Sequence, residues 1–189
     1  MSMSSPDKKI SGGGRASGSV HASYALRTKR LAVSSILAAM AMILSYIEAL
    51  FPLPVPVPGI KLGLANLVIL IAIYRLGFRY AFVINCVRIL TAGLLFTGLF
   101  GAAYSMAGGV LSIIIMYGLY RSGRFGCVGI SMAGGVAHNF GQIVTACLIM
   151  SNIRLMSYFS VLLFAGMASG ILIGIAAWFV LGKLPHLKV

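Results

Sequence analysis

Residues 31–51, LAVSSILAAMAMILSYIEALF, are apolar apart from three serines, a tyrosine and the carboxylate of Glu48. A helix of about 20 such residues crosses a bilayer, so this stretch predicts a membrane-spanning helix. Ionisable side chains inside a span are costly and usually line a pathway or a binding cavity. Glu48 is therefore the first candidate for a functional residue.

The whole chain shares the composition of this stretch. Its 189 residues are 60% hydrophobic and only 9% charged, with a mean hydropathy of +1.02. Soluble domains carry about 25% charged residues, so the composition excludes a soluble domain. The length after residue 30 leaves room for roughly six spans with short loops. The sequence predicts an all-α integral membrane protein with a bundle of six transmembrane helices over residues 28–183.

The apolar stretches set the expected boundaries. Residues 1–27 are polar, basic and rich in Ser and Gly, which predicts a disordered tail, and residues 184–189 form a second short tail. The first loop carries four alternating prolines, which forbid a helix and favour a stiff, extended segment. The six spans are expected at about 31–51, 62–75, 80–100, 102–120, 127–150 and 157–181.

The Lys and Arg residues predict the orientation in the membrane. With the N-terminus in the cytoplasm, twelve of them lie on that side, Lys61 and Arg154 lie outside, and Arg88 lies within a span. Positive charge marks the cytoplasmic side, so both termini are expected there in a multi-pass protein of the cell membrane. The net charge of +13 does not indicate a nucleic-acid partner, because the basic residues flank apolar runs instead of sharing one accessible face.

One hexamer, SMAGGV, occurs at residues 105–110 and again at residues 131–136. It places the glycine pairs Gly108–Gly109 and Gly134–Gly135 inside two spans. The copies could be a duplicated binding element, or the glycines could let two helices approach closely, as small residues do in membranes. Helix packing is the preferred interpretation.

Ionisable and amide side chains also lie inside the other spans. At a rise of about 1.5 Å per residue, Arg88 lies roughly 12 Å, His138 roughly 16 Å and Gln142 roughly 22 Å from the inner edge. Glu48 and Asn66 lie near the outer ends of their spans. The polar groups therefore climb from mid-membrane to the outer face, which is the pattern of a cavity open to the outside.

Spacing along each helix brings some of these side chains to one face. His138 and Gln142 are four residues apart and share a face, whereas Asn139 is turned about 100° away. Asn85 and Arg88 are three residues apart and also share a face. An isolated arginine in lipid is untenable, so Arg88 is expected to face the interior and find a polar partner or an anionic ligand.

Each of these residues also has a purely structural interpretation. Arg88 could pin two helices together, His138 and Asn139 could form interhelical hydrogen bonds, Glu48 could be a solvated cap, and Lys61 could anchor at the headgroups. Together they are more informative than any one of them. The predicted substrate-binding residues are Glu48, Lys61, Asn66, Arg88, His138, Asn139 and Gln142.

The sequence does not predict an enzyme, a metal site or a cofactor. Asp7 and Glu48 are the only acidic residues, which excludes catalysis by paired carboxylates. There is no DDxxD-type pair for magnesium and diphosphate, no Walker lysine loop and no HExxH motif. Cys86, Cys127 and Cys147 have no metal-binding spacing and are expected to be small packing residues.

Five segments resemble one known family: LSYIEALFPL (44–53), PGIKLGLANL (58–67), VRIL (87–90), SMAGGVLS (105–112) and GGVAHNFGQ (134–142). They are similar to the Gx transporter family, also labelled heptaprenyl diphosphate synthase component I, over residues 28–182. Members resemble the substrate-binding S components of energy-coupling factor (ECF) importers. Those are six-helix proteins of prokaryotic cell membranes, which take a vitamin-like solute from outside and associate with a coupling membrane protein and two ATPases.

This resemblance implies a function and a set of partners. The chain would bind a vitamin- or cofactor-precursor-like solute for uptake, surrounded by membrane lipid, and Pro56, Pro58 and Gly59 would belong to a gating loop over the site. The alternative is a non-catalytic membrane subunit of a complex for prenyl diphosphate or quinone biosynthesis, or for flavin-linked electron transfer. The synthase label by itself does not imply catalysis, because the residues that would ionise a prenyl diphosphate are absent.

Overall fold

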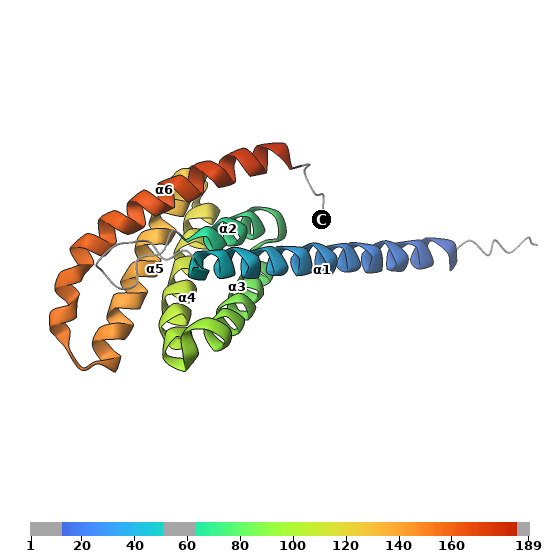
Figure 1. Cartoon of the computed structure of the whole chain (residues 1–189). Coiled ribbons are helices and arrows are strands. Elements are labelled where there is room, and N and C mark those ends of the chain that lie inside the picture. The colour runs from blue at the N-terminus through green and yellow to red at the C-terminus, as the bar shows by residue number, and fades with distance from the viewer. Residues whose placement is uncertain (1–12, 51–62, 185–189) are drawn as a thin grey trace, which may run out of the picture.

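A computed structural model describes residues 13–50 and 63–184, and this part of the chain is helical with no β-strand. The all-α prediction is therefore confirmed. Figure 1 shows the arrangement of the helices. The α-helices are α1 (Gly13–Leu50), α2 (Leu64–Leu76), α3 (Phe78–Ala92), α4 (Gly98–Ser122), α5 (Cys127–Ile149) and α6 (Phe159–Lys183). A π-helix, η1 (Gly93–Thr97), joins α3 to α4, and a 3-10 helix, η2 (Ile153–Tyr158), precedes α6.

Five of the helical segments are long and apolar enough to cross a membrane, which indicates a multi-pass membrane protein. These segments are Leu26–Leu50, Phe78–Phe96, Gly98–Ser122, Cys127–Ile149 and Ile153–Lys183. The remaining helix, α2, has 13 residues. Its length of about 20 Å is less than the hydrocarbon thickness of about 30 Å. A topology with six complete spans therefore stays a prediction.

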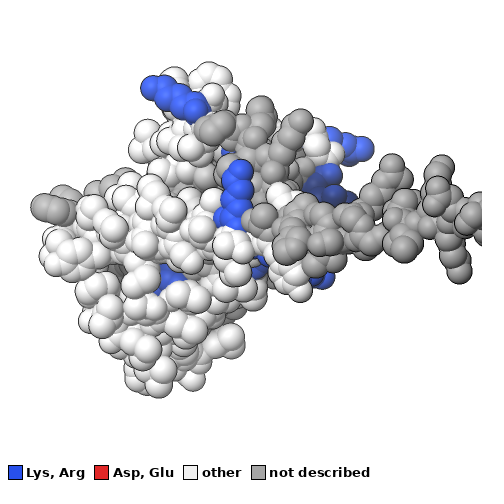
Figure 2. Space-filling view, turned by 90° about the vertical axis from the view of Figure 1, so that its right-hand side faces the viewer, with Lys and Arg blue, Asp and Glu red and all other residues white. Residues whose placement is uncertain are grey.

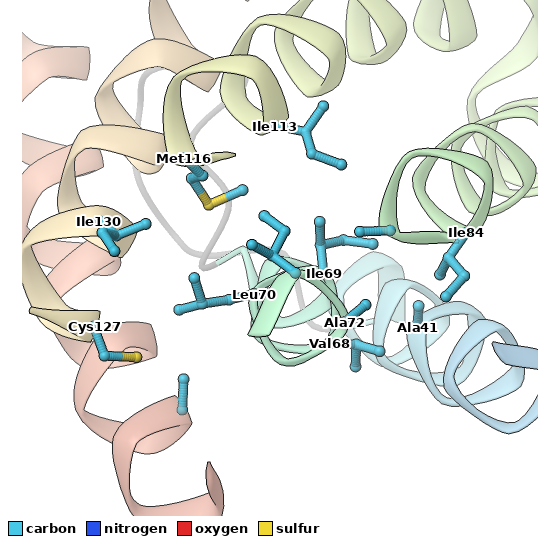
Figure 3. Packing of buried hydrophobic residues seen from close by; sticks show 13 residues of the cluster. Ala41, Val68, Ile69, Leu70, Ala72, Ile84, Ile113, Met116, Cys127 and Ile130 are labelled. Atoms are coloured by element: carbon cyan, nitrogen blue, oxygen red, sulfur yellow. The ribbon is translucent and has the colours of Figure 1, made fainter. Parts of the chain in front are cut away.

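The short helix α2 forms the centre of the core. Its sequence, LANLVILIAIYRL, is apolar on nearly all sides, and such a helix is buried from all sides. Ile69 and Leu70 of α2 lie in the middle of Figure 3, with Ile113 of α4, Ile84 of α3 and Ala41 of α1 around them. The other helices are thus positioned by packing against α2.

The other helices surround α2 in two groups. In Figure 1, α1 runs beside α2 and α3, and its N-terminal part projects beyond them. On the other side α5 lies between α4 and α6, and α6 curves along the outside. Figure 2 shows a largely uncharged surface on which Lys and Arg side chains form separate spots. Such a surface suits a protein surrounded by lipid.

The C-terminal ends of α2, α4 and α6, which carry basic residues, lie at one end of the bundle. Arg75, at the end of α2, donates hydrogen bonds from Nη2 to the carbonyl oxygens of Leu181 (2.7 Å) and Leu184 (2.9 Å). Tyr74 packs on Tyr120 near the end of α4, with ring centroids 4.7 Å apart. The ends of α2, α4 and α6 therefore meet, which agrees with the expectation that their basic residues share one side of the membrane.

The opposite end holds the end of α1 and the start of α2. There Tyr46 of α1 lies beside Phe96 of η1, with ring centroids 5.4 Å apart. The junction between α3 and α4 also lies at this end. The predicted outer side of the membrane corresponds to this end.

Two boundaries differ from the sequence predictions. Residues 13–27 were expected to be disordered, but α1 begins at Gly13. Once a helix has nucleated, each added residue gains one hydrogen bond, and this stretch contains no proline to stop it. The structure therefore has a helix from Gly13 onward where the sequence predicted a disordered tail.

The turn between the third and fourth spans comes earlier than the predicted break at residue 101. Gly98, with φ of +70°, begins α4 directly after the π-helix. A positive φ is accessible to glycine at little cost. Gly93 packs so tightly on Ala102 that a Cβ there would overlap it. The chain therefore reverses between these close contacts.

Candidate functional site

A cavity of about 90 Å³ lies where α1, α2, α3 and α5 converge, with α4 and α6 completing its wall. Five of the predicted site residues line it: Glu48, Asn66, Arg88, His138 and Asn139. They come from four different helices, so the fold brings together side chains that are distant in the sequence. The cavity lies toward the end of the bundle where α1 ends and α2 begins.

Glu48 closes the cavity at the end of α1. Its Oε1 accepts a 2.5 Å hydrogen bond from the backbone nitrogen of Gly63, which precedes α2 with φ of +75°. The first N–H groups of a helix have no partner within it, and a negative charge near them is favourable. Glu48 therefore caps a neighbouring helix while it forms part of the cavity wall.

Arg88 is held from one side by an amide chain that starts on its own helix. Its Nη2 donates a 2.8 Å hydrogen bond to Oδ1 of Asn85, and Nδ2 of Asn85 donates a 3.0 Å bond to the carbonyl of Gly109 on α4. Nε of Arg88 is buried without a hydrogen-bond partner among the described residues. A guanidinium has five N–H donors, so this one retains capacity for an anionic group in the cavity.

Asn139 and His138 enter the cavity from α5. Nδ2 of Asn139 donates a 2.7 Å hydrogen bond to the carbonyl oxygen of Leu162 on α6, so much of this amide serves helix packing. The His138 ring lies beside α4, where a Cβ on Gly108 would be 3.3 Å from its Cε1. An imidazole and a guanidinium in the wall of one cavity favour hydrogen bonding to a polar or anionic group.

Gln142 does not line the polar cavity, although it was predicted to bind substrate. Its side chain is completely buried between α4 and α5, against Gly108. Both the nitrogen and the oxygen of its amide lack hydrogen-bond partners in the described part of the chain. The four-residue spacing predicted that Gln142 shares a face of α5 with His138. It did not predict that α4 packs over the Gln142 side chain.

Four other predicted residues, Lys61 and the gating-loop residues Pro56, Pro58 and Gly59, lie outside the residues that the structure describes. Three serines that the sequence analysis did not single out line the cavity: Ser45, Ser105 and Ser169. Ser45 lies three residues before Glu48, so its spacing was a usable signal. Serine inside apolar helices is otherwise a weak signal, because it also occurs at packing contacts.

The four SMAGGV glycines lie at helix contacts. A Cβ on Gly108 would be 2.7 Å from the carbonyl oxygen of His138, and one on Gly134 would be 2.6 Å from the Met116 side chain. A Cβ on Gly135 would overlap the carbonyl oxygen of Gly166, and one on Gly109 would overlap the side chain of Ile89. The backbones of α4, α5 and α6 therefore approach closely around the cavity.

The donor set suits binding and orientation of a polar solute. The described residues contribute to the cavity one carboxylate, one guanidinium, one imidazole, two amides and three hydroxyls. Among the described residues, no three His, Cys, Asp or Glu side chains are close enough to hold a metal ion. Arg88 and His138 favour an anionic or strongly hydrogen-bonding group.

A family model described as "Heptaprenyl diphosphate synthase component I" matches residues 37–180. The match begins within α1, ends within α6 and includes the five predicted residues that line the cavity. It confirms the family label that the sequence motifs indicated. No curated protein and no solved structure matches the chain.

Proposed function

Since the chain belongs to the heptaprenyl diphosphate synthase component I family, we propose that it is a non-catalytic membrane subunit that binds a small solute. The family name describes a component, which supports a role alongside other polypeptides. The single observation that carries the proposal is the polar cavity, in which charged and amide side chains from four helices meet inside an otherwise apolar bundle.

The proposed role is that of an S-component-like subunit for uptake. The solute, of the vitamin or cofactor-precursor kind, enters from the outer side, and separate coupling and ATPase subunits drive its release into the cell. Support for the direction comes from the position of the cavity. It lies near the end of α1 and the start of α2, away from the basic ends of α2, α4 and α6. Positive charge marks the cytoplasmic side, so the cavity belongs to the outer half of a six-span protein with both termini inside.

A second candidate function is supported by the family name itself. In this alternative the chain is a non-catalytic membrane subunit of a complex for prenyl diphosphate or quinone biosynthesis, or for flavin-linked electron transfer. The two candidates share the membrane bundle and differ in their partners.

Purification of the tagged, full-length chain from its native membrane distinguishes the two candidates. Mass spectrometry of the co-purifying proteins should find a coupling membrane protein and ATPases if the chain serves uptake. A soluble synthase or a flavoprotein in their place would support the second candidate and refute the importer. A thermal-shift screen of the same preparation with vitamins and their precursors then identifies the class of solute.

A further inference from the structure

A second and larger cavity adjoins the polar one. It has a volume of about 480 Å³ and lies between α4, α5, η2 and α6. Its wall is almost entirely apolar, and the side chains that define it include Phe100, Ile143, Ala146 and Leu162. Tyr104 and Tyr158 add two phenol groups to this wall.

Residues of α4, α5 and α6 line both cavities, and Asn139 in the polar wall donates a 2.7 Å hydrogen bond to the carbonyl oxygen of Leu162 in the apolar wall. On α5, His138, Gln142 and Ala146 follow one another at intervals of four residues and therefore share a face. His138 lines the polar cavity and Ala146 lines the apolar one. On α4, the adjacent residues Ser105 and Tyr104 line the polar and the apolar cavity respectively.

Gln142 lies on α5 between His138 of the polar wall and Ala146 of the apolar wall, although it lines neither cavity itself. Its amide is completely buried, and neither its nitrogen nor its oxygen has a hydrogen-bond partner among the described residues. Buried amides in native proteins are nearly always satisfied, so such an atom pair points to a partner beyond the described residues. Nε of Arg88, on the polar side, is buried without a partner as well.

The volumes of the two cavities indicate which part of a ligand each of them could hold. Pockets that enclose a small molecule measure about 300–1,000 Å³, so the polar cavity of about 90 Å³ has room only for a head group. The volume of the apolar cavity, about 480 Å³, lies within that range without any contribution from the polar cavity.

The apolar cavity opens on the surface that lipid would cover. Phe100 and Met150 both line it and are 75% and 68% exposed on the outside of the bundle. A molecule with an apolar tail can therefore reach this cavity sideways from the bilayer.

A third hollow, of about 510 Å³, provides a contrast. It lies on another face of α5, beside Ala133, Ala137 and Phe140, and all the side chains that line it are apolar. Because no polar side chain of the described residues lines it, this hollow resembles an ordinary lipid contact.

From these relations we propose that the two adjoining cavities form one site for an amphiphile. Its anionic head lies by Arg88 and His138, and its apolar tail lies in the cavity beside Ala146, with Gln142 bonding to the linking atoms. This inference rests on the proposed solute-binding function and specifies the class of solute.

The test is direct binding to the full chain in lipid nanodiscs. Three tailed probes are compared with their heads alone: farnesyl diphosphate with diphosphate, farnesyl monophosphate with phosphate, and farnesoic acid with acetate. Burial of two or more methylene groups strengthens binding about tenfold or more, so at least one tailed probe should exceed its head by that factor. If no tailed probe binds more tightly than its head, the amphiphile site does not exist.

Three variants test whether the apolar tail of the probe lies in the apolar cavity. Ala146→Phe fills the apolar cavity from α5 and should remove the advantage of the tailed probe, as should Gly101→Leu from α4. Ala137→Phe makes the same change on the same helix but in the contrasting hollow, and it should retain the advantage. Equal effects of Ala146→Phe and Ala137→Phe would overturn the assignment. If a solute without a tail binds in an Arg88-dependent manner while the tails add nothing, the proposed function survives and only the amphiphile fails.

Discussion

The carboxylate of Glu48 and the backbone nitrogen of Gly63 are joined by a 2.5 Å hydrogen bond, which ties the end of α1 to the start of α2. Because α2 is the centre of the core, this bond fixes one wall of the polar cavity to the most buried helix. The same bond holds the first turn of α2, where Asn66 projects into the cavity.

Replacement of Glu48 should lower stability in a graded order. Glu48→Ala leaves the Gly63 N–H without its acceptor, which costs about 1–3 kcal/mol. Glu48→Gln keeps an oxygen acceptor and loses only the charge, so its loss should be smaller. Thermal unfolding of the purified proteins in one detergent measures both. If both variants unfold at the same temperature as the wild-type protein, the hydrogen bond between Glu48 and Gly63 does not hold the two helices together.

The substitution Gly135→Ala should force α5 and α6 apart and lower the stability of the protein. The added Cβ meets the carbonyl oxygen of Gly166, and such overpacking costs about 1–3 kcal/mol. Gly118→Ala on α4 is the matched control, because no atom lies within 4 Å of its added Cβ. Alanine is also the better helix former by about 1 kcal/mol, so the control should melt at or above the wild-type temperature. Similar melting temperatures for both variants would contradict the close approach.

Asn139 should behave as a packing residue. Its amide bonds to the Leu162 carbonyl, and such interhelical bonds in membranes are worth about 0.6 kcal/mol on average. Asn139→Ala should therefore lower the melting temperature slightly and change the affinity for the solute less than twofold. Thermal unfolding and equilibrium binding on the same preparation check this. A loss of affinity without a loss of stability would instead make Asn139 a ligand contact.

Much of the fold could be predicted from the sequence, because apolar length sets the spans. Helical rise also placed Arg88 and His138 at mid-membrane depth and Glu48 and Asn66 near the outer ends of their spans, and the structure brings all four to one cavity. Depth along a helix follows from counting residues, so this part of the prediction depended little on tertiary packing.

Counting residues could not predict how each helix is rotated about its axis or which of its side chains the neighbouring helices enclose. Asn139 was expected to be turned away from His138, yet both line the cavity because α6 supplies a wall on the Asn139 side. Gln142 shares a face with His138, yet α4 approaches so closely at Gly108 that this side chain is enclosed. Such cover depends on glycine contacts between helices far apart in the sequence.

The central claim is that the polar cavity binds a solute through Arg88. Arg88→Ala removes the guanidinium that the described residues contribute to the cavity wall, whereas Arg154→Ala removes an equal charge from an exposed position on η2. Arg88→Lys keeps the charge but loses the planar set of donors, so it should bind with intermediate affinity.

Equilibrium binding of the solute found in the thermal-shift screen, by the wild-type protein and these variants in nanodiscs, is the most direct measurement. A hydrogen bond to a charged group is worth about 1.5–3 kcal/mol, so Arg88→Ala should weaken binding by about tenfold or more while Arg154→Ala leaves it unchanged. If Arg88→Ala binds as tightly as the wild-type protein, the cavity is not the binding site and the proposed function is wrong.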